Sequence, residues 1–132
     1  MNPNAKKWVA ALRSGEYEQT SYSLQDDLGY CCLGVACAVY EQETGNATQK
    51  RKCRESNLPR DVLTGSDLSS QPQVRQWIGL NSDCGFFESP KYGAMSLTSL
   101  NDNCGCDFKE IADIIEAEAE ELFVHEEGKS NE

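Results

Sequence analysis

Cysteine and histidine are the residues of this chain with the greatest potential for covalent chemistry. The 132-residue sequence contains seven cysteines and a single histidine, His125. A cysteine nucleophile needs a base within hydrogen-bond reach, and His125 lies apart from every cysteine, at the ragged end of an acidic segment. The patterns G-x-x-x-x-G-K-[ST], G-x-G-x-x-G, H-E-x-x-H and G-x-S-x-G do not occur. We therefore expect no catalytic residues and a protein that is not an enzyme.

The spacing of the cysteines favours core packing over metal binding. Zinc sites use paired C-x-x-C ligands, whereas this chain has the adjacent Cys31 and Cys32 and the C-x-C of Cys104 and Cys106. An odd number of cysteines excludes a fully paired disulfide framework. Cys31, Cys32 and Cys37 lie in an apolar run, which is typical of small buried side chains in a reducing compartment. We expect neither a metal nor a cofactor.

Two polar segments could bind a ligand. Asn101 and Asp102 precede the last expected helix, where their side chains either cap helix ends and build a turn or hydrogen-bond a ligand in a pocket. Five of the twelve basic residues fall between Lys50 and Arg60. That stretch is either a soluble loop or a lid over a phosphate-bearing ligand.

Negative charge is concentrated at one end of the chain. The net charge is −10, and residues 107–132 carry ten acids against two lysines. This end would repel duplex nucleic acid, so we expect that the protein does not bind duplex nucleic acid directly. The acidic helix is either a solvated face or a mimic of nucleic-acid phosphates.

Four helical segments are expected to position these residues. The first helix has Asn2 as its N-cap and Pro3 at its first position, and it ends at Gly15. Asp107 and Glu110 form a capping-box pattern before the last helix. The last helix is expected over residues 108–124. Two further helices are expected between the first and the last, over residues 31–44 and 72–78. Gly34 inside the second of the four helices indicates either close approach of another element or an unusual helix start, and Trp77 is expected to anchor the core.

The remaining segments predict one hairpin and two loops. Residues 16–30 alternate loosely around a turn at residues 26–29, which is typical of a short β-hairpin, and residues 46–57 and 81–93 read as loops. We expect an α+β, mostly α fold: a compact single domain of about four helices with a small β-hairpin. The domain spans residues 1–124, and residues 125–132 form a flexible acidic tail.

No segment has the length of a membrane anchor. The longest apolar run, residues 31–40, is about half of the roughly 20 residues that a span requires. The N-terminus has two lysines without the apolar stretch of a signal peptide behind them. We expect a cytoplasmic protein that makes no membrane contact.

Three pieces of sequence, taken in order, resemble a known family. They are residues 8–15 (WVAALRSG), residues 30–35 (YCCLGV), and residues 100–102 (LND) followed by residues 108–113 (FKEIAD). The combination is similar to small, mostly uncharacterised proteins of bacteriophages and prophages. The resemblance implies an infected bacterial cytoplasm, where accessory phage proteins counter host defences, and it carries over no catalytic residue.

Three functions follow from this setting. The first is sequestration of a small nucleotide-derived immune signal, bound by the residues Arg13, Tyr30, Cys31, Cys32, Arg51, Asn101 and Asp102. The second is an acidic antagonist, a nucleic-acid mimic that covers a host nuclease or DNA-binding protein. The third is a structural or regulatory phage protein without a ligand, and a homo-oligomer is left open. The first function requires the last helix to pack onto the cysteine-rich segment around a hollow.

Overall fold

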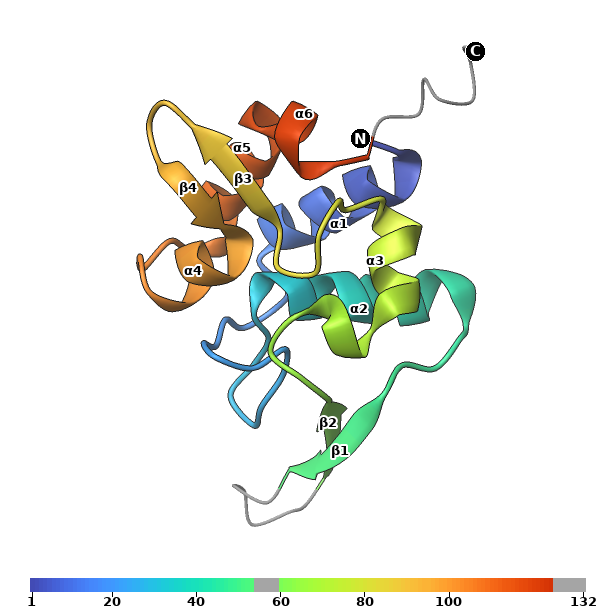
Figure 1. The fold of residues 1–132 in the computed structure, drawn as a ribbon. Coiled ribbons are helices and arrows are strands. Elements are labelled where there is room, and N and C mark those ends of the chain that lie inside the picture. Colours follow the sequence, from blue (N-terminus) through green and yellow to red (C-terminus); the bar gives the residue numbers. More distant parts are fainter. Residues whose placement is uncertain (54–59, 125–132) are drawn as a thin grey trace.

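Helices are the predominant regular elements of the computed structural model, which describes residues 1–53 and 60–124 (Figure 1). Within these ranges there are six α-helices and two antiparallel strand pairs, which confirms the expected α+β, mostly α class. In chain order the elements are α1 (Pro3–Ser14), α2 (Cys32–Thr44), β1 (Lys50–Cys53), β2 (Arg60–Leu63), a 3-10 turn (Leu68–Ser70), α3 (Pro72–Ile78), β3 (Phe86–Ser89), β4 (Gly93–Ser96), α4 (Leu97–Asp102), α5 (Phe108–Ala117) and α6 (Ala119–Leu122).

Local capping signals define the ends of α1 as expected. The Asn2 side chain accepts a hydrogen bond from the amide of Ala5 at 2.7 Å, and Pro3 occupies the first helical position. Gly15 ends the helix with a φ of 78°, a left-handed conformation that glycine adopts without steric cost.

Helix α2 lies at the centre of the molecule and is buried on most sides. Its cysteines are packed in the core, and Gly34 faces the loop that carries Leu24. A Cβ atom on Gly34 would overlap the carbonyl oxygen of Leu24, which accounts for a glycine inside a helix. The indole nitrogen of Trp8 in α1 donates to the buried carbonyl of Cys32 at 2.9 Å, so a hydrogen bond reinforces the packing of these two helices.

The last helical segment is two helices instead of the single one expected over residues 108–124. The capping box at its start is confirmed, with both the Asp107 and the Glu110 side chain bonded to backbone amides. The helix breaks at Glu118, and α6 follows and ends at Leu122. The amide of Val124 then bonds to the carbonyl of Gly79, a long-range pairing that draws the chain out of helical geometry.

The packing of α5 also differs from expectation. Its principal helix contacts are with α1 and α4, which both contact α2 in turn. The last helix is therefore connected to the cysteine-rich α2 mainly through these two helices, and not through the extensive direct packing that we expected. Ser96 caps α4, a short helix that the sequence patterns did not predict. Trp77, expected in the core, is half-buried at its edge, where it meets Tyr40 in a T-shaped contact.

Strands β1 and β3 lie where loops were expected. Within the expected loop 46–57, β1 pairs with β2, and Arg51 lies opposite Val62. Residues 54–59 lie outside the described residues. The loop expected over 81–93 contains β3, which pairs with β4 so that Phe87 lies opposite Met95. Phe87 is fully buried, whereas Phe86 is 45% exposed.

The β-hairpin expected over residues 16–30 does not form a continuous ladder of backbone hydrogen bonds. The turn at residues 26–29 is confirmed by a 2.9 Å bond from the amide of Asp26 to the carbonyl of Gly29. Only isolated bridges from Tyr30 to Gln19 and Gln25 flank it. The amide of Leu24 bonds instead to the carbonyl of Gly65, so tertiary pairing replaces the local ladder.

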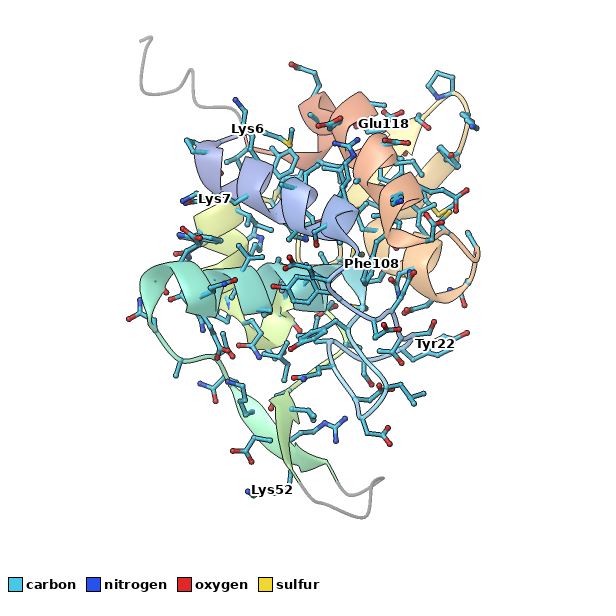
Figure 2. The ribbon with its side chains drawn as sticks, turned by 180° about the vertical axis from the view of Figure 1, so that it is seen from behind. Lys6, Lys7, Tyr22, Lys52, Phe108 and Glu118 are labelled. Atoms are coloured by element: carbon cyan, nitrogen blue, oxygen red, sulfur yellow. The ribbon has the colours of Figure 1, made fainter. Side chains whose placement is uncertain are left out.

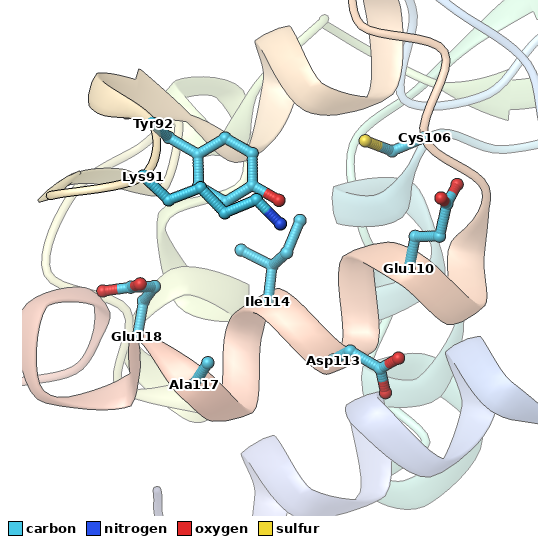
Figure 3. A pocket seen from close by; sticks show the side chains of 8 residues that line it. All are labelled: Lys91, Tyr92, Cys106, Glu110, Asp113, Ile114, Ala117 and Glu118. Atoms are coloured by element: carbon cyan, nitrogen blue, oxygen red, sulfur yellow. The ribbon is translucent and has the colours of Figure 1, made fainter.

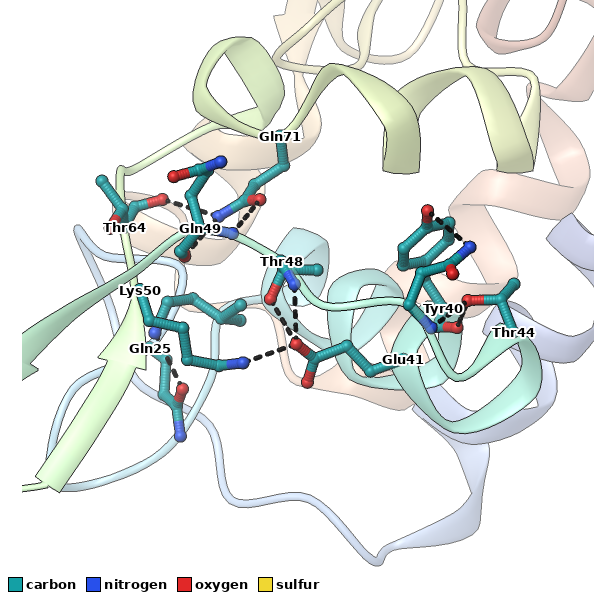
Figure 4. A network of polar contacts seen from close by, with 11 residues as sticks. Gln25, Tyr40, Glu41, Thr44, Thr48, Gln49, Lys50, Thr64 and Gln71 are labelled. Atoms are coloured by element: carbon teal, nitrogen blue, oxygen red, sulfur yellow. Dashed lines mark hydrogen bonds and ion pairs between the residues drawn. The ribbon is translucent and has the colours of Figure 1, made fainter.

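A polar network anchors the base of the β1–β2 hairpin to the core (Figure 4). The buried Gln71 side chain accepts from the amide of Gln49 at 3.0 Å and donates to the carbonyls of Gln49 and Thr64. Glu41 of α2 accepts from the amide and hydroxyl of Thr48 and pairs with Lys50. Burial acts to raise the pKa of the Glu41 carboxyl, but these hydrogen bonds outweigh it and lower the pKa below its ordinary value.

The expected acidic tail, residues 125–132, lies outside the described residues. No helix in residues 1–53 and 60–124 combines the length and the apolar character needed to traverse a bilayer.

Candidate functional site

Asn101 joins three segments of the chain by hydrogen bonds, in an arrangement that we call the Asn101 junction. Asn101 is 4% exposed, and its Oδ1 accepts from the amide of Cys32 at 3.1 Å and from Nε2 of Gln19 at 2.8 Å. Its Nδ2 donates to the carbonyl of Thr20 at 2.7 Å and to Oδ1 of Asp102 at 2.9 Å. An amide side chain offers two donor hydrogens and two acceptor lone pairs, so Asn101 has no capacity left for a ligand.

Asp102 shapes the neighbouring loop. Its Oδ1 also accepts from the amide of Tyr22 at 2.9 Å, and the Tyr22 hydroxyl donates to Asn103 at 3.3 Å. Tyr22 has a φ of 71°, the one positive value outside glycine among the residues that the structure describes. The turn-building role that we considered for Asn101 and Asp102 therefore accounts for their contacts.

The start of α2 is occupied by contacts within the protein. The amide of Cys31 bonds to the carbonyl of Leu24, and the amide of Cys32 bonds to Asn101. Burial raises the pKa of the Cys31 thiol to about 12 and also raises that of Cys32. Both side chains are therefore neutral thiols at physiological pH and poor nucleophiles. Tyr30 packs edge-on against Tyr17 with ring centroids 5.5 Å apart.

The two arginines of the expected ligand site lie away from this region. Arg13 joins α1 to α5 through ion pairs with Asp113 at 2.6 Å and Glu116 at 2.9 Å. The hydrogen bond with Glu116 and then that with Asp113 raise the pKa of Arg13, and the same contact lowers the pKa of Glu116. Arg51 is exposed on β1, the strand that also carries Lys52. Figure 2 shows Lys52 and Glu118 at opposite ends of the molecule.

The seven expected site residues therefore occupy three places. Tyr30, Cys31, Cys32, Asn101 and Asp102 lie at or beside the Asn101 junction. Arg13 lies between α1 and α5, and Arg51 lies on the β1–β2 hairpin. The structure brings the first group together as a structural crosslink.

A cavity of about 360 Å³ lies between the β3–β4 turn and α5 (Figure 3). We had expected a hollow beside Cys31 and Asn101, but neither residue lines this one. The lining residues are Lys91, Tyr92, Cys106, Glu110, Asp113, Ile114, Ala117 and Glu118.

The cavity combines an apolar wall with carboxylates. Tyr92 is held edge-on against the buried Phe87, with ring centroids 6.2 Å apart, and the Nζ of Lys91 lies 5.2 Å from the Tyr92 ring centroid. Burial, and then the nearby Glu110, raise the pKa of the Cys106 thiol, so this part of the wall is uncharged at neutral pH.

Helices α5 and α6 present a surface that we call the acidic face. It comprises the exposed carboxylates of Glu110, Asp113, Glu116, Glu120 and Glu121. The opposite side of α5 is buried in the core through Ile111 and Ile115, among others, so the helix has a fixed orientation. Such a surface can attract cations and basic proteins, and it disfavours phosphate groups.

The sequence patterns did not identify several residues of the Asn101 junction and of the cavity. Gln19 and Thr20, which complete the Asn101 junction, lie in a segment without clear periodicity, so no local signal marks them. Lys91 and Tyr92 lie in the turn between β3 and β4. The aromatic ring between Pro90 and Gly93 was the available signal there, since an aromatic in a turn needs a partner surface.

No group of three or more His, Cys, Asp or Glu side chains within residues 1–53 and 60–124 is arranged to hold a metal ion.

Comparison with known proteins identifies a family. The model of the family described as "Domain of unknown function (DUF8296)" matches residues 1–119, and the chain belongs to that family. No curated protein and no solved structure matches the chain.

Proposed function

We propose that this member of the DUF8296 family is a non-catalytic binding protein whose acidic face covers a basic surface on a protein partner. One observation carries the proposal: five exposed carboxylates project from two consecutive helices whose apolar sides are fixed in the core. The charge is therefore displayed on a rigid support. A rigid display loses less conformational entropy on binding than a flexible acidic tail would.

The five carboxylates of the acidic face outnumber the two basic residues, Arg13 and Lys109, that pair with them or share their helices. Arg13 pairs with Asp113 and Glu116. The sequence of α5 and α6 contains one basic residue, Lys109. An excess of negative potential is left to steer a basic partner toward this end of the molecule.

The resemblance to bacteriophage proteins suggests the class of partner. In an infected cell the acidic face would compete with nucleic acid for the basic surface of a host nuclease or DNA-binding protein. This phage setting stays a prediction, as does a purely structural or regulatory role.

Sequestration of a nucleotide-derived signal also stays a prediction. The contacts of its expected residues favour it less, because the Asn101 amide is fully hydrogen-bonded and Arg51 lies on the distant hairpin. The carboxylates around the cavity would repel a phosphate.

A capture experiment with two variants of equal net charge tests the proposal. The face variant combines Asp113→Asn with Glu116→Gln, Glu120→Gln and Glu121→Gln. The scattered variant replaces four exposed glutamates elsewhere, Glu16, Glu18, Glu43 and Glu88, by glutamine. Each protein is immobilised and exposed to bacterial lysate, and bound proteins are quantified by mass spectrometry at low and high salt.

The wild type and the scattered variant should enrich nucleases or DNA-binding proteins at least tenfold over the face variant. This enrichment should fall steeply as salt rises, because exposed charges are screened. Equal capture by the two variants would contradict the proposal, as would a captured set without basic proteins. Melting temperatures within a few degrees of wild type establish that both variants are folded.

A further inference from the structure

We propose that the cavity beside α5 is a socket for the guanidinium group of an arginine side chain presented by the basic partner. This inference rests on the proposed function and deepens it. The acidic face would supply long-range attraction, and the cavity would supply a specific anchor. Interfaces generally concentrate binding energy in a few anchors of this kind, and arginine is enriched among them.

The size of the cavity suits one side chain or a small ligand. Its volume of about 360 Å³ is near the lower limit for small-molecule pockets, which start at roughly 300 Å³. Ile114, which is 9% exposed, lies beside the Tyr92 ring and gives the cavity an apolar surface for methylene groups (Figure 3).

The carboxylates of the cavity differ in how far they are already engaged. Asp113 is paired with Arg13, and Oε1 of Glu110 accepts from the amide of Asp107. Glu118 is half-buried, and its side chain has no hydrogen bond or ion pair within residues 1–53 and 60–124. Glu118 is therefore the carboxylate best placed to receive a cation from outside.

The aromatic wall already holds a cation of this chain. The Nζ of Lys91 lies 5.2 Å from the Tyr92 ring centroid, within the range of cation–π attraction. Lys91 itself is exposed, so it can move aside, whereas the Tyr92 ring is held by Phe87. A cation from a partner would compete with Lys91 for the same ring.

The chemistry of the lining favours a guanidinium over an ammonium group. A guanidinium is planar, stacks on aromatic faces and can bond both oxygens of a carboxylate, and it is less strongly hydrated than an ammonium group. The cavity places an aromatic ring and an unpaired carboxylate around one hollow. An arginine side chain uses both features at once.

Binding of a capped arginine, N-acetyl-arginine methylamide, tests the socket without any partner protein. The probe is titrated into the full chain, and backbone amide shifts are followed by NMR. We expect saturable shifts at Tyr92, Ile114 and Ala117. Capped citrulline, a neutral near-isostere of the same shape, should bind at least tenfold more weakly, and capped lysine should bind more weakly than arginine.

Variants with matched charge changes locate the binding. Glu118→Gln should weaken the capped arginine at least fivefold. Glu121→Gln removes the same charge from the acidic face outside the cavity lining and should change binding less than twofold. Lys91→Gln should strengthen binding about threefold, because the competing cation is gone. Equal effects of the two glutamate changes, or equal binding of citrulline and arginine, would overturn the socket.

A cavity-filling variant separates this inference from the proposed function. Ala117→Leu adds apolar volume at the exposed edge of the cavity without changing charge, and leucine is a good helix former. It should abolish binding of the capped arginine and reduce partner capture at least threefold. If Ala117→Leu captures the partner like wild type while the face variant does not, the socket is wrong and the proposed function stands. If the capped arginine binds but the face variant captures normally, the proposed function is wrong.

Discussion

The Asn101 junction and the acidic face use polar side chains in opposite ways, although only a few residues separate them in the chain. At the junction every hydrogen-bonding position of the Asn101 amide is occupied by a group of the same protein. On the acidic face the carboxylates point to solvent, and Arg13 pairs with two of them. The comparison teaches that a polar residue in a distinctive motif is a ligand candidate only if it keeps bonding capacity after folding.

The difference also separates stability from binding. Buried polar networks are costly to break, because the groups left behind lose both water and their partners. Exposed ion pairs contribute little to the free energy of unfolding. Substitutions at the junction should therefore alter stability, and those on the acidic face should alter binding.

Asn101→Ala should have the largest effect. The substitution leaves the amide of Cys32 and the carbonyl of Thr20 buried without their partner, and each such group costs about 1–3 kcal/mol. We expect the free energy of unfolding, measured by urea denaturation, to fall by about 3 kcal/mol or more. The exposed Asn103→Ala is the control and should lower it by less than about 1 kcal/mol. A small loss for Asn101→Ala would show that the hydrogen bonds of the Asn101 junction contribute little to stability.

Gly34→Ala should cause the second-largest loss in the free energy of unfolding, although helix propensity alone would favour alanine. Alanine is favoured over glycine in a helix by about 1 kcal/mol, but here its Cβ would overlap the Leu24 carbonyl. We expect a net loss of about 2 kcal/mol in the free energy of unfolding, typical of overpacking. Ala10→Gly on the exposed side of α1 is the propensity control, with an expected loss of about 1 kcal/mol. If Gly34→Ala were more stable than the wild type, the loop that carries Leu24 would have to move at little cost to accommodate the added Cβ atom.

Trp8→Phe should cost less because the core stays apolar. It removes the indole donor to the Cys32 carbonyl, which is buried, and it leaves a small void. We expect the free energy of unfolding to fall by about 2 kcal/mol, of which the lost hydrogen bond supplies roughly half. The half-buried Trp77→Phe should lose less in the same urea experiment. Equal losses at the two positions would remove the distinction between the centre and the edge of the core.

Arg13→Gln should have the smallest effect on stability and a clear effect on titration. Arg13 holds the pKa of Glu116 below its ordinary value in the folded protein. That stabilisation is present above the unfolded pKa of glutamate and is lost as pH falls through the lower folded pKa. In Arg13→Gln, NMR titration of the Glu116 side chain should give a pKa closer to the ordinary one. An unchanged pKa would show that the ion pair between Arg13 and Glu116 is not maintained in solution.

The parts of the fold that follow local rules were predictable from the sequence. Asn2, Gly15 and the capping box at Asp107 define helix ends through bonds spanning only a few residues. Gly34 was also interpretable, because a glycine inside an apolar helix indicates close packing. These features depend on near neighbours, which the sequence lists directly.

The misplaced elements depend on partners far along the chain. The basic segment forms β1 because β2 lies beside it, and α6 ends where the amide of Val124 bonds to the carbonyl of Gly79. The role of Asn101 depends on Gln19 and Thr20, which are about 80 residues away in the sequence. The hydrophobic pattern of one segment does not indicate which distant segment it will contact.

The hydrogen bond from the amide of Val124 to the carbonyl of Gly79 holds the end of the described chain near α3. Asn2 also donates to the carbonyl of Trp77, so both ends of the described domain are fastened to the end of α3. Neighbouring ends of this kind suit circular permutation. A short glycine–serine bridge from Val124 back to Met1, with new termini opened at Gly93 in the β3–β4 turn, should preserve the helical core while cutting the wall that carries Tyr92.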